Sequence, residues 1–291
     1  MLEGVLFALA AAVVYGVLGV VFEIAGKRQY KVWDVLLVKQ CVGACIGLVC
    51  TALMHIPLGN WRLLALGLIG AVAYVVTLAA YLMASREKDI ATNWTIVNLS
   101  VAVPIVLSVL WLGDAFSPEK MIGIVLTIIS IVLIGGRSGA TSIGEKTGSQ
   151  WLMFITIAFL LNGVLVILFR FVPERQGPLF TMYFYGISFL LVIPYKVFRD
   201  RKWRPEPGLV GVSAAAAISH WSGIMLTIVA LSQVARVSRE TGLIVYPITN
   251  GLVIPVGVLL GVVFLKERLN RRTGVGVMLG VAALVFLLVP H

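Results

Sequence analysis

Apolar segments long enough to span a membrane recur along almost the whole chain. A helix rises about 1.5 Å per residue, so some 20 apolar residues cross a hydrocarbon core of roughly 30 Å. Of the 291 residues, 60% are hydrophobic and only 12% are charged, and the mean hydropathy of +1.02 exceeds what a soluble domain requires. The sequence therefore predicts an all-α integral membrane protein with ten transmembrane helices. These are expected over residues 4–25, 32–54, 63–84, 90–112, 121–136, 150–172, 178–197, 208–233, 241–265 and 273–289.

Several residues in the first half of the chain recur in the same order in the second half. The run Ser85-Arg86-Glu87 returns as Ser238-Arg239-Glu240. Each copy holds five predicted spans, and an odd number of spans inverts the second copy relative to the first. The sequence thus predicts two inverted five-helix repeats, residues 1–136 and 150–291, joined by a linker loop at 137–149, an arrangement typical of secondary transporters. The other matching pairs are Trp94 with Tyr246, Asn98 with Asn250, Pro104 with Pro255, and Asp114 with Glu267.

The basic residues are distributed according to the loops between the predicted spans. The formal net charge is +10, from 23 lysines and arginines against 13 aspartates and glutamates. Most of the basic residues lie in or beside the odd-numbered loops, which the positive-inside rule places in the cytoplasm, so both termini are predicted to lie outside. A nucleic-acid partner is not expected, because the chain has no basic folded domain outside its spans.

Three cysteines, Cys41, Cys45 and Cys50, fall on the second predicted span. A thiol within a span behaves as a small buried hydrophobic group rather than as half of a disulfide. Cys41 and Cys45 share a helical face, but they have no histidine or carboxylate neighbours that would complete a metal site. We therefore expect neither a metal nor another cofactor.

The end of each half resembles the drug/metabolite transporter superfamily, and its EamA-type branch most closely. In each half a proline-bearing fourth helix is followed by an acidic residue and, nine residues later, a glycine. The resemblance implies a ten-helix transporter of the prokaryotic plasma (inner) membrane and favours export, but it leaves the substrate open. Members with ten helices keep both termini in the cytoplasm, opposite to the charge pattern here. Two residues depart from the family pattern: Asp114 replaces the usual glutamate, and Lys39 stands where many members carry an arginine. The residues that carry the resemblance are Pro104, Gly113, Asp114 and Gly123 in the first half, and Pro255, Glu267, Arg268, Leu269 and Gly276 in the second half.

The fourth and ninth predicted helices carry the most polar side chains of their halves. Trp94 and Asn98 lie on the fourth helix, and Tyr246 and Asn250 occupy the matching positions on the ninth. An aromatic ring can stack on a solute, and an amide both donates and accepts hydrogen bonds. These four residues are predicted to line a substrate cavity near mid-membrane that lacks a fixed charge. The alternative is that the amides join helices and the rings form interfacial belts.

His220 lies near the middle of the eighth predicted span. A neutral imidazole at this depth could bind substrate or take up a proton, whereas the alternative is a packed histidine bonded to a backbone carbonyl. Tyr183 and Tyr185 alternate along the seventh span, so only one of the two is expected to face the cavity. Tyr15 on the first span is a further substrate-binding candidate, with ordinary packing as its alternative.

Three charged residues fall within spans. Glu23 and Lys39 lie at similar depths on the first two spans and could pair, and the repeat places Arg170 at the position of Glu23. These residues are candidates for a gate or for contact with a charged substrate. Snorkelling of Lys39 and Arg170 to the lipid headgroups is the alternative that the sequence favours.

Three prolines fall inside the fourth and ninth predicted helices: Pro104, Pro247 and Pro255. A proline removes a backbone hydrogen bond and loosens the preceding turn. The three positions are therefore candidates for helix flexing during transport, although proline is also simply tolerated in membrane spans.

Taken together, the sequence predicts a secondary transporter that moves a small amphipathic solute, an amino acid or related metabolite, by alternating access. Its expected partners are this small-molecule substrate, membrane lipids and protons as a candidate coupling ion, and it is expected to be a monomer or homodimer. One alternative is a flippase for a lipid headgroup or a polyprenyl carrier. A less favoured alternative is an intramembrane enzyme, for which His220 with Ser219 or Ser222 is the one conceivable starting point.

Overall fold

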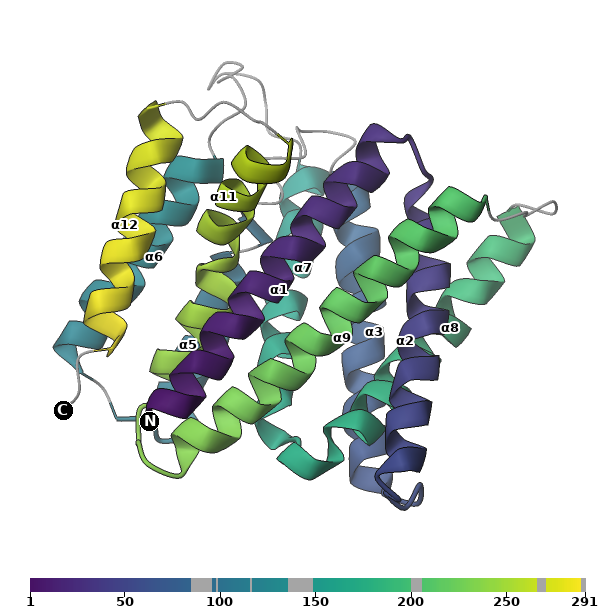
Figure 1. The fold of residues 1–291 in the computed structure, drawn as a ribbon, viewed down its shortest axis with the longest axis horizontal. Helices are drawn as coiled ribbons and strands as arrows, with labels where there is room; N and C mark the ends of the chain where they lie inside the picture. Colours follow the sequence, from purple (N-terminus) through teal and green to yellow (C-terminus); the bar gives the residue numbers. More distant parts are fainter. Residues whose placement is uncertain are drawn as a thin grey trace.

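The computed structural model describes residues 1–84, 96–97, 99–115, 117–135, 149–199, 206–265 and 271–288. Throughout this part of the chain the secondary structure is helical, with no strand (Figure 1). The first half contributes α1 (Leu2–Lys27), α2 (Val32–Leu53), α3 (Trp61–Ala84), η1 (Leu99–Val101), α5 (Ala102–Leu110) and α6 (Pro118–Gly135). The second half contributes α7 (Ser149–Leu168), η2 (Phe169–Phe171), η3 (Glu174–Gln176), α8 (Gly177–Arg199), α9 (Pro207–Ala235), α10 (Thr241–Tyr246), η4 (Pro247–Gly251), α11 (Val253–Leu265) and α12 (Arg271–Leu288).

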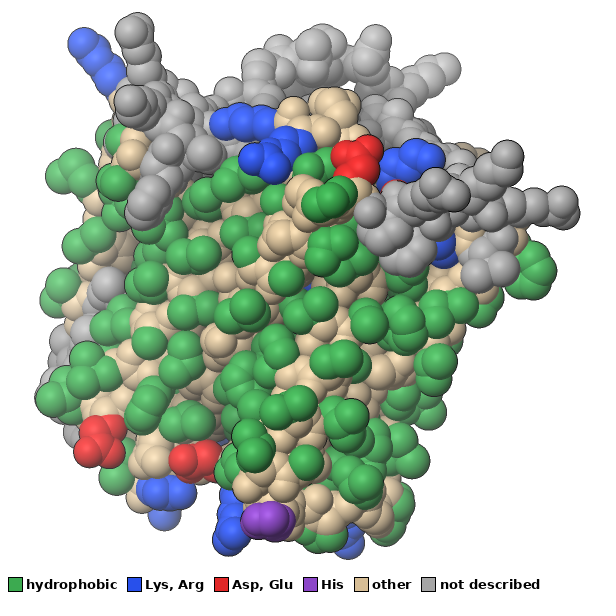
Figure 2. All heavy atoms as spheres, turned by 45° about the vertical axis from the view of Figure 1, so that its right-hand side comes forward, with side chains coloured by type: hydrophobic (Ala, Val, Ile, Leu, Met, Phe, Trp, Pro, Cys, Tyr) green, Lys and Arg blue, Asp and Glu red, His purple; other side chains and the backbone are tan. Residues whose placement is uncertain are grey.

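Six helical segments are long and apolar enough to cross a membrane, and shorter apolar helices accompany them. The flank of the molecule in Figure 2 is covered by hydrophobic side chains, whereas charged side chains gather at its two ends. Large apolar residues such as Leu110, Val263 and Met278 are more than two thirds exposed. Such a surface is stable against lipid tails but not against water, so the fold is that of an integral membrane protein. The six segments are Leu2–Lys27, Val32–Leu53, Trp61–Tyr81, Gln150–Phe171, Glu174–Lys196 and Pro207–Ala235.

The main helix contacts run between the two halves of the chain. α1 packs along α9, α3 along α7, α2 along α8, and α6 along α12. Two glycines allow aromatic rings of one half to approach the other half closely. A Cβ atom on Gly43 would lie 2.6 Å from the ring of Tyr185, and one on Gly223 would lie 2.5 Å from the ring of Tyr15. Because neither helix could approach so closely with a larger residue, these glycines fix where both tyrosines lie.

The helix expected over 241–265 is not continuous. It consists of α10, a π-helical turn at Pro247–Gly251 and α11. The backbone N–H of Leu252 donates to the carbonyl of Pro247 at 3.1 Å, one residue further back than in an α-helix. Pro247 has no N–H to donate, so the regular ladder is already broken where the wider turn begins. Pro104 and Pro255 instead lie in the first turns of α5 and α11, where their missing N–H is tolerated.

Candidate functional site

Lys39 and His220 lie at the centre of a polar and aromatic group enclosed by five helices. Lys39 Nζ donates to the hydroxyl of Tyr74 at 2.9 Å and lies 3.0 Å from His220 Nδ1. The hydroxyl of Tyr185 lies 2.7 Å from the same ring nitrogen. We call Tyr15, Lys39, Tyr74, Phe184, Tyr185 and His220 the central cluster.

Aromatic rings surround the imidazole of His220. Its centroid lies 5.7 Å from those of Tyr74 and Tyr185, 6.1 Å from that of Tyr15 and 6.2 Å from that of Phe184. Lys39 Nζ also lies 4.8 Å from the centroid of the Tyr74 ring and 5.5 Å from that of Tyr185, within the range of cation–π attraction. The polar groups therefore lie inside an apolar, aromatic shell.

The central cluster combines full burial with partial access. Lys39 and Tyr185 have no exposed surface at all, whereas Tyr15, Tyr74 and His220 remain half-buried. Tyr15, Tyr74 and His220 lie near the middles of α1, α3 and α9, several turns from either helix end. The cluster is thus positioned deep in the membrane, with accessible surface beside a fully enclosed amine.

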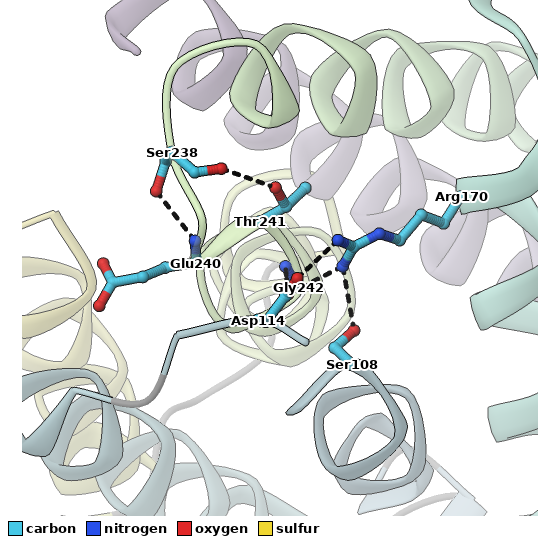
Figure 3. A network of polar contacts seen from close by, with 7 residues as sticks. All are labelled: Ser108, Asp114, Arg170, Ser238, Glu240, Thr241 and Gly242. Atoms are coloured by element: carbon cyan, nitrogen blue, oxygen red, sulfur yellow. Dashed lines mark hydrogen bonds and ion pairs between the residues drawn. The ribbon is translucent and has the colours of Figure 1, made fainter. Parts of the chain in front are cut away.

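A second polar site joins the two halves where α5 and α7 end and α10 begins (Figure 3). Arg170 makes a two-pronged contact with Asp114, with Nη1 to Oδ2 at 2.8 Å and Nη2 to Oδ1 at 2.5 Å. Its Nη1 also lies 3.4 Å from the hydroxyl of Ser108, and the backbone N–H of Gly242 donates to Asp114 Oδ2 at 2.5 Å. Parallel hydrogen bonds of this kind are the strongest that an arginine forms. We call Ser108, Asp114, Arg170 and Gly242 the salt-bridge network.

The local chain geometry explains why this network forms. Asp114 lies in the loop after α5, Arg170 lies in η2, and Gly242 is the second residue of α10. The carboxylate accepts an N–H that the first turn of a helix leaves without an internal partner. A Cβ atom on Gly242 would lie 2.1 Å from Ser108 Oγ and 2.8 Å from Asp114 Oδ2, so only glycine permits this approach. The backbone N–H of Ala115 also donates a hydrogen bond of 2.7 Å to the carbonyl of Arg239. This bond joins the loop after α5 to the loop before α10.

The structure brings together four of the residues singled out from the sequence. Tyr15, Lys39, Tyr185 and His220 all belong to the central cluster, although they come from four helices. Sequence reasoning missed Tyr74, which supplies the hydroxyl that Lys39 contacts. The signal available for it was a phenol in the middle of an otherwise apolar span.

The neighbouring tyrosines of α8 differ in direction. Tyr185 points to His220, whereas the hydroxyl of Tyr183 donates to the carbonyl of Leu58 in the loop between α2 and α3. Of the two tyrosines, Tyr183 is therefore the one that does not join the cluster.

Of the candidate substrate-binding residues on the fourth and ninth predicted helices, the structure describes Tyr246 and Asn250, and neither belongs to the central cluster. Tyr246 is fully buried in the hydrophobic core, and Asn250 Nδ2 donates to Thr249 Oγ1 at 2.8 Å within the π-helical turn. Trp94 and Asn98 lie outside the described residues, as does the side chain of Glu23. The cavity predicted from Trp94, Asn98, Tyr246 and Asn250, and the pairing of Glu23 with Lys39, therefore remain predictions.

Two expectations about charge were wrong. Snorkelling was favoured for Lys39 and Arg170, but Lys39 is fully buried against Tyr74 and His220, and Arg170 pairs with Asp114. In both cases partners distant in the sequence offer the cation hydrogen bonds that replace the headgroup contacts.

The fold and these two sites define a multi-pass membrane protein with polar groups enclosed between its two halves. Residues 2–136, just under half of the chain, match the model of the EamA-like transporter family, which confirms the resemblance that the sequence motifs indicated. The fold is also found in a solved crystal structure, with a TM-score of 0.71. The superposition covers 98% of this chain and 97% of the chain in that structure. At 15% sequence identity, this likeness shows the fold alone. No protein of curated function matches the chain.

Proposed function

We propose that the protein is a secondary transporter that moves a small amphipathic organic solute by alternating access, with the central cluster as its binding site. The observation that carries this proposal is a fully buried amine that contacts side chains from both halves of the chain. Ionisable groups this deep in a membrane are costly and rare, and they mark substrate or ion pathways. Transport sites of repeat-built carriers lie at such an interface near the midplane.

The helix contacts support a ten-helix inverted repeat, with residues 1–136 and 150–291 as its halves. In this proposal α5, α6, the α10–α11 segment and α12 are four further crossings beside the six long spans. If α1, α2, α3 and α6 are matched with α7, α8, α9 and α12, the contact of α1 with α9 becomes that of α7 with α3. The contacts of α2 with α8 and of α6 with α12 map onto themselves. A two-fold relation between halves predicts this pattern.

The salt-bridge network is suited to hold one end of the transport path closed. It ties the loop after α5 to η2 and to the start of α10, and Asp114 is almost fully enclosed. The positive-inside rule places this end outside the cell. In the proposed cycle, opening to the outside breaks the contacts of Asp114, whereas the solute reaches the central cluster from the cytoplasm. Export follows from the family resemblance, and His220 is the candidate proton carrier.

Binding and flux measurements on the purified protein test this proposal. Thermal shifts against amino acids, organic acids, cationic drugs, nucleosides and lipid precursors would identify a stabilising solute, and counterflow of that solute into proteoliposomes would establish transport. Tyr185→Phe is expected to weaken the stabilising shift and His220→Ala to abolish it, whereas Tyr183→Phe, two residues away on the same helix, should leave it unchanged. Stabilisation by lipid precursors alone would instead support the flippase.

A further inference from the structure

The central cluster offers more hydrogen-bond donors than acceptors. An ammonium carries three N–H donors and no acceptor, and one nitrogen of a neutral imidazole carries either a proton or a lone pair. Lys39 Nζ and the Tyr185 hydroxyl both lie within 3.0 Å of the same nitrogen, His220 Nδ1. Only one of them can donate to it at a time. With Tyr74 as its other partner, protonated Lys39 keeps at least one N–H for an additional acceptor.

Within the described side chains, the charge of Lys39 has no anionic counterpart. Its polar contacts are a phenol and an imidazole, and the cation–π contacts with Tyr74 and Tyr185 are also made with neutral rings. Arg170, by contrast, forms a salt bridge with Asp114. An enclosed cation of this kind is stabilised most by an anion that arrives with the bound solute.

We propose that the central cluster binds the carboxylate of a small monoanionic acid with an aromatic or other apolar body, with Lys39 holding the carboxylate. This inference rests on the proposed transport function and names its substrate class. The carboxylate would accept from Lys39 and from the Tyr185 hydroxyl once that hydroxyl is released from His220. The apolar body would lie against the rings that surround the imidazole, which present aromatic rather than charged surface.

The same contacts argue against other charge types. A phosphate monoester carries a charge near −2 and is usually held by several cationic groups, whereas Lys39 is the one lysine or arginine within the cluster. An amine group on the ligand would find no carboxylate among the cluster residues. A carboxylic acid without an α-amine therefore fits this site better than the matching amino acid does.

Four probes that share a phenyl ring on a two- or three-carbon chain test the proposal. They are 3-phenylpropionate, phenylalanine, 3-phenylpropanol and phenethylamine, which differ mainly in charge. Their dissociation constants would be measured by calorimetry on the full-length protein in nanodiscs. The acid is expected to bind tightest, and the alcohol roughly 10- to 100-fold more weakly, as for the loss of one hydrogen bond to a charged group.

Variants at Lys39 connect this preference to the amine. Lys39→Met keeps the length of the side chain but removes its charge, so the acid and the alcohol should bind equally. Lys39→Arg keeps the charge and should retain most of the preference. Arg62→Gln removes one positive charge at the exposed start of α3 and should leave all four affinities unchanged. If Lys39→Met does not fold, Tyr74→Phe serves as the second variant, because loss of the Tyr74 hydroxyl alters the position of Lys39 and should reduce the preference for the acid.

Each other outcome overturns the carboxylate proposal in a recognisable way. Tighter binding of phenylalanine or phenethylamine than of the acid would assign another charge class to the cluster while leaving a transporter. An acid preference that survives in Lys39→Met would move the carboxylate site elsewhere. Lack of binding of all four probes, with proteoliposome flux of some other solute, would refute this substrate class alone. Lack of flux for every solute tested would refute the transport function itself.

Discussion

The central cluster and the salt-bridge network both enclose a cation between the two halves of the chain, but the partners that they offer to the cation differ. Arg170 meets a carboxylate through two parallel hydrogen bonds, and that carboxylate also accepts a backbone N–H. Lys39 meets a phenol, an imidazole and aromatic faces. Among the described side chains, the network thus pairs its cation with a carboxylate without a ligand, whereas the amine of Lys39 has no carboxylate partner. This difference suggests that the network serves structure and closure and that the cluster serves binding.

The largest effect should come from removing one partner of the network. Asp114→Ala leaves the Arg170 guanidinium and the Gly242 N–H without their carboxylate, and loss of one partner of a buried ion pair costs about 3–5 kcal/mol. Denaturation in detergent micelles measures the change in the free energy of unfolding. The double variant Asp114→Ala/Arg170→Met should recover much of this loss. A double variant as unstable as the single one would show that the pair is not the source of the effect.

In the central cluster, removing the cation is expected to leave the free energy of unfolding unchanged or to raise it. Lys39→Met replaces an enclosed amine by an apolar chain of similar length, which removes the cost of burying a charge that has no carboxylate partner among the described side chains. The melting temperature should therefore hold or rise while counterflow activity is lost. Strong destabilisation by Lys39→Met would contradict the comparison, because the amine would then contribute to folding as Asp114 does.

A steric change tests the close approach within the network. Gly242→Ala places a methyl group against Ser108 and Asp114, and overpacking of this kind costs about 1–3 kcal/mol. Gly186→Ala on α8 is the matched control, since a Cβ atom there meets nothing within 4 Å. The two variants should differ in thermal stability in the same micelles, and equal melting temperatures would mean that the loops move apart at little cost.

The same two regions show what the sequence could predict. Hydropathy located the six long spans, because a span must be apolar over its whole length. The depth of His220 and the alternation of Tyr183 with Tyr185 were also readable, because both follow from helix periodicity. The partners of Lys39 could not be predicted from the sequence, because Tyr74 and His220 lie 35 and 181 positions further along the chain. Their meeting depends on how α2, α3 and α9 pack, which no local pattern records.

The salt-bridge network illustrates the same limit. Asp114 and Arg170 could each be identified, but the sequence matched Arg170 with Glu23 by repeat rather than with Asp114 by contact. The contact depends on a loop that brings the carboxylate to the first turn of α10, and on a glycine whose role appears only when that approach is seen. Likewise, Pro247 indicated a weak point in the helix, whereas the π-helical form of the turn depends on the backbone geometry there.

The smallest effect should come from the phenol that contacts His220. Tyr185→Phe removes the hydroxyl 2.7 Å from Nδ1 while keeping the ring against Gly43. Loss of one such hydrogen bond changes the free energy of unfolding by about 0.5–1.5 kcal/mol. Lys39 and Tyr185 share one nitrogen of His220, so in the variant Lys39 can donate to that nitrogen alone. The change in the free energy of unfolding should therefore lie at the low end of this range.

The binding consequence of Tyr185→Phe should be more visible than its effect on stability. If Lys39 is drawn to His220, it has fewer N–H groups to offer a carboxylate, and the affinity for 3-phenylpropionate should fall several-fold. The affinity for 3-phenylpropanol should change less. Tyr183→Phe, which alters only the contact with the loop before α3, provides the baseline in the same calorimetric measurement. Equal losses for both ligands would mean that Tyr185 shapes the site without acting through Lys39, and would separate the aromatic shell from the charge at its centre.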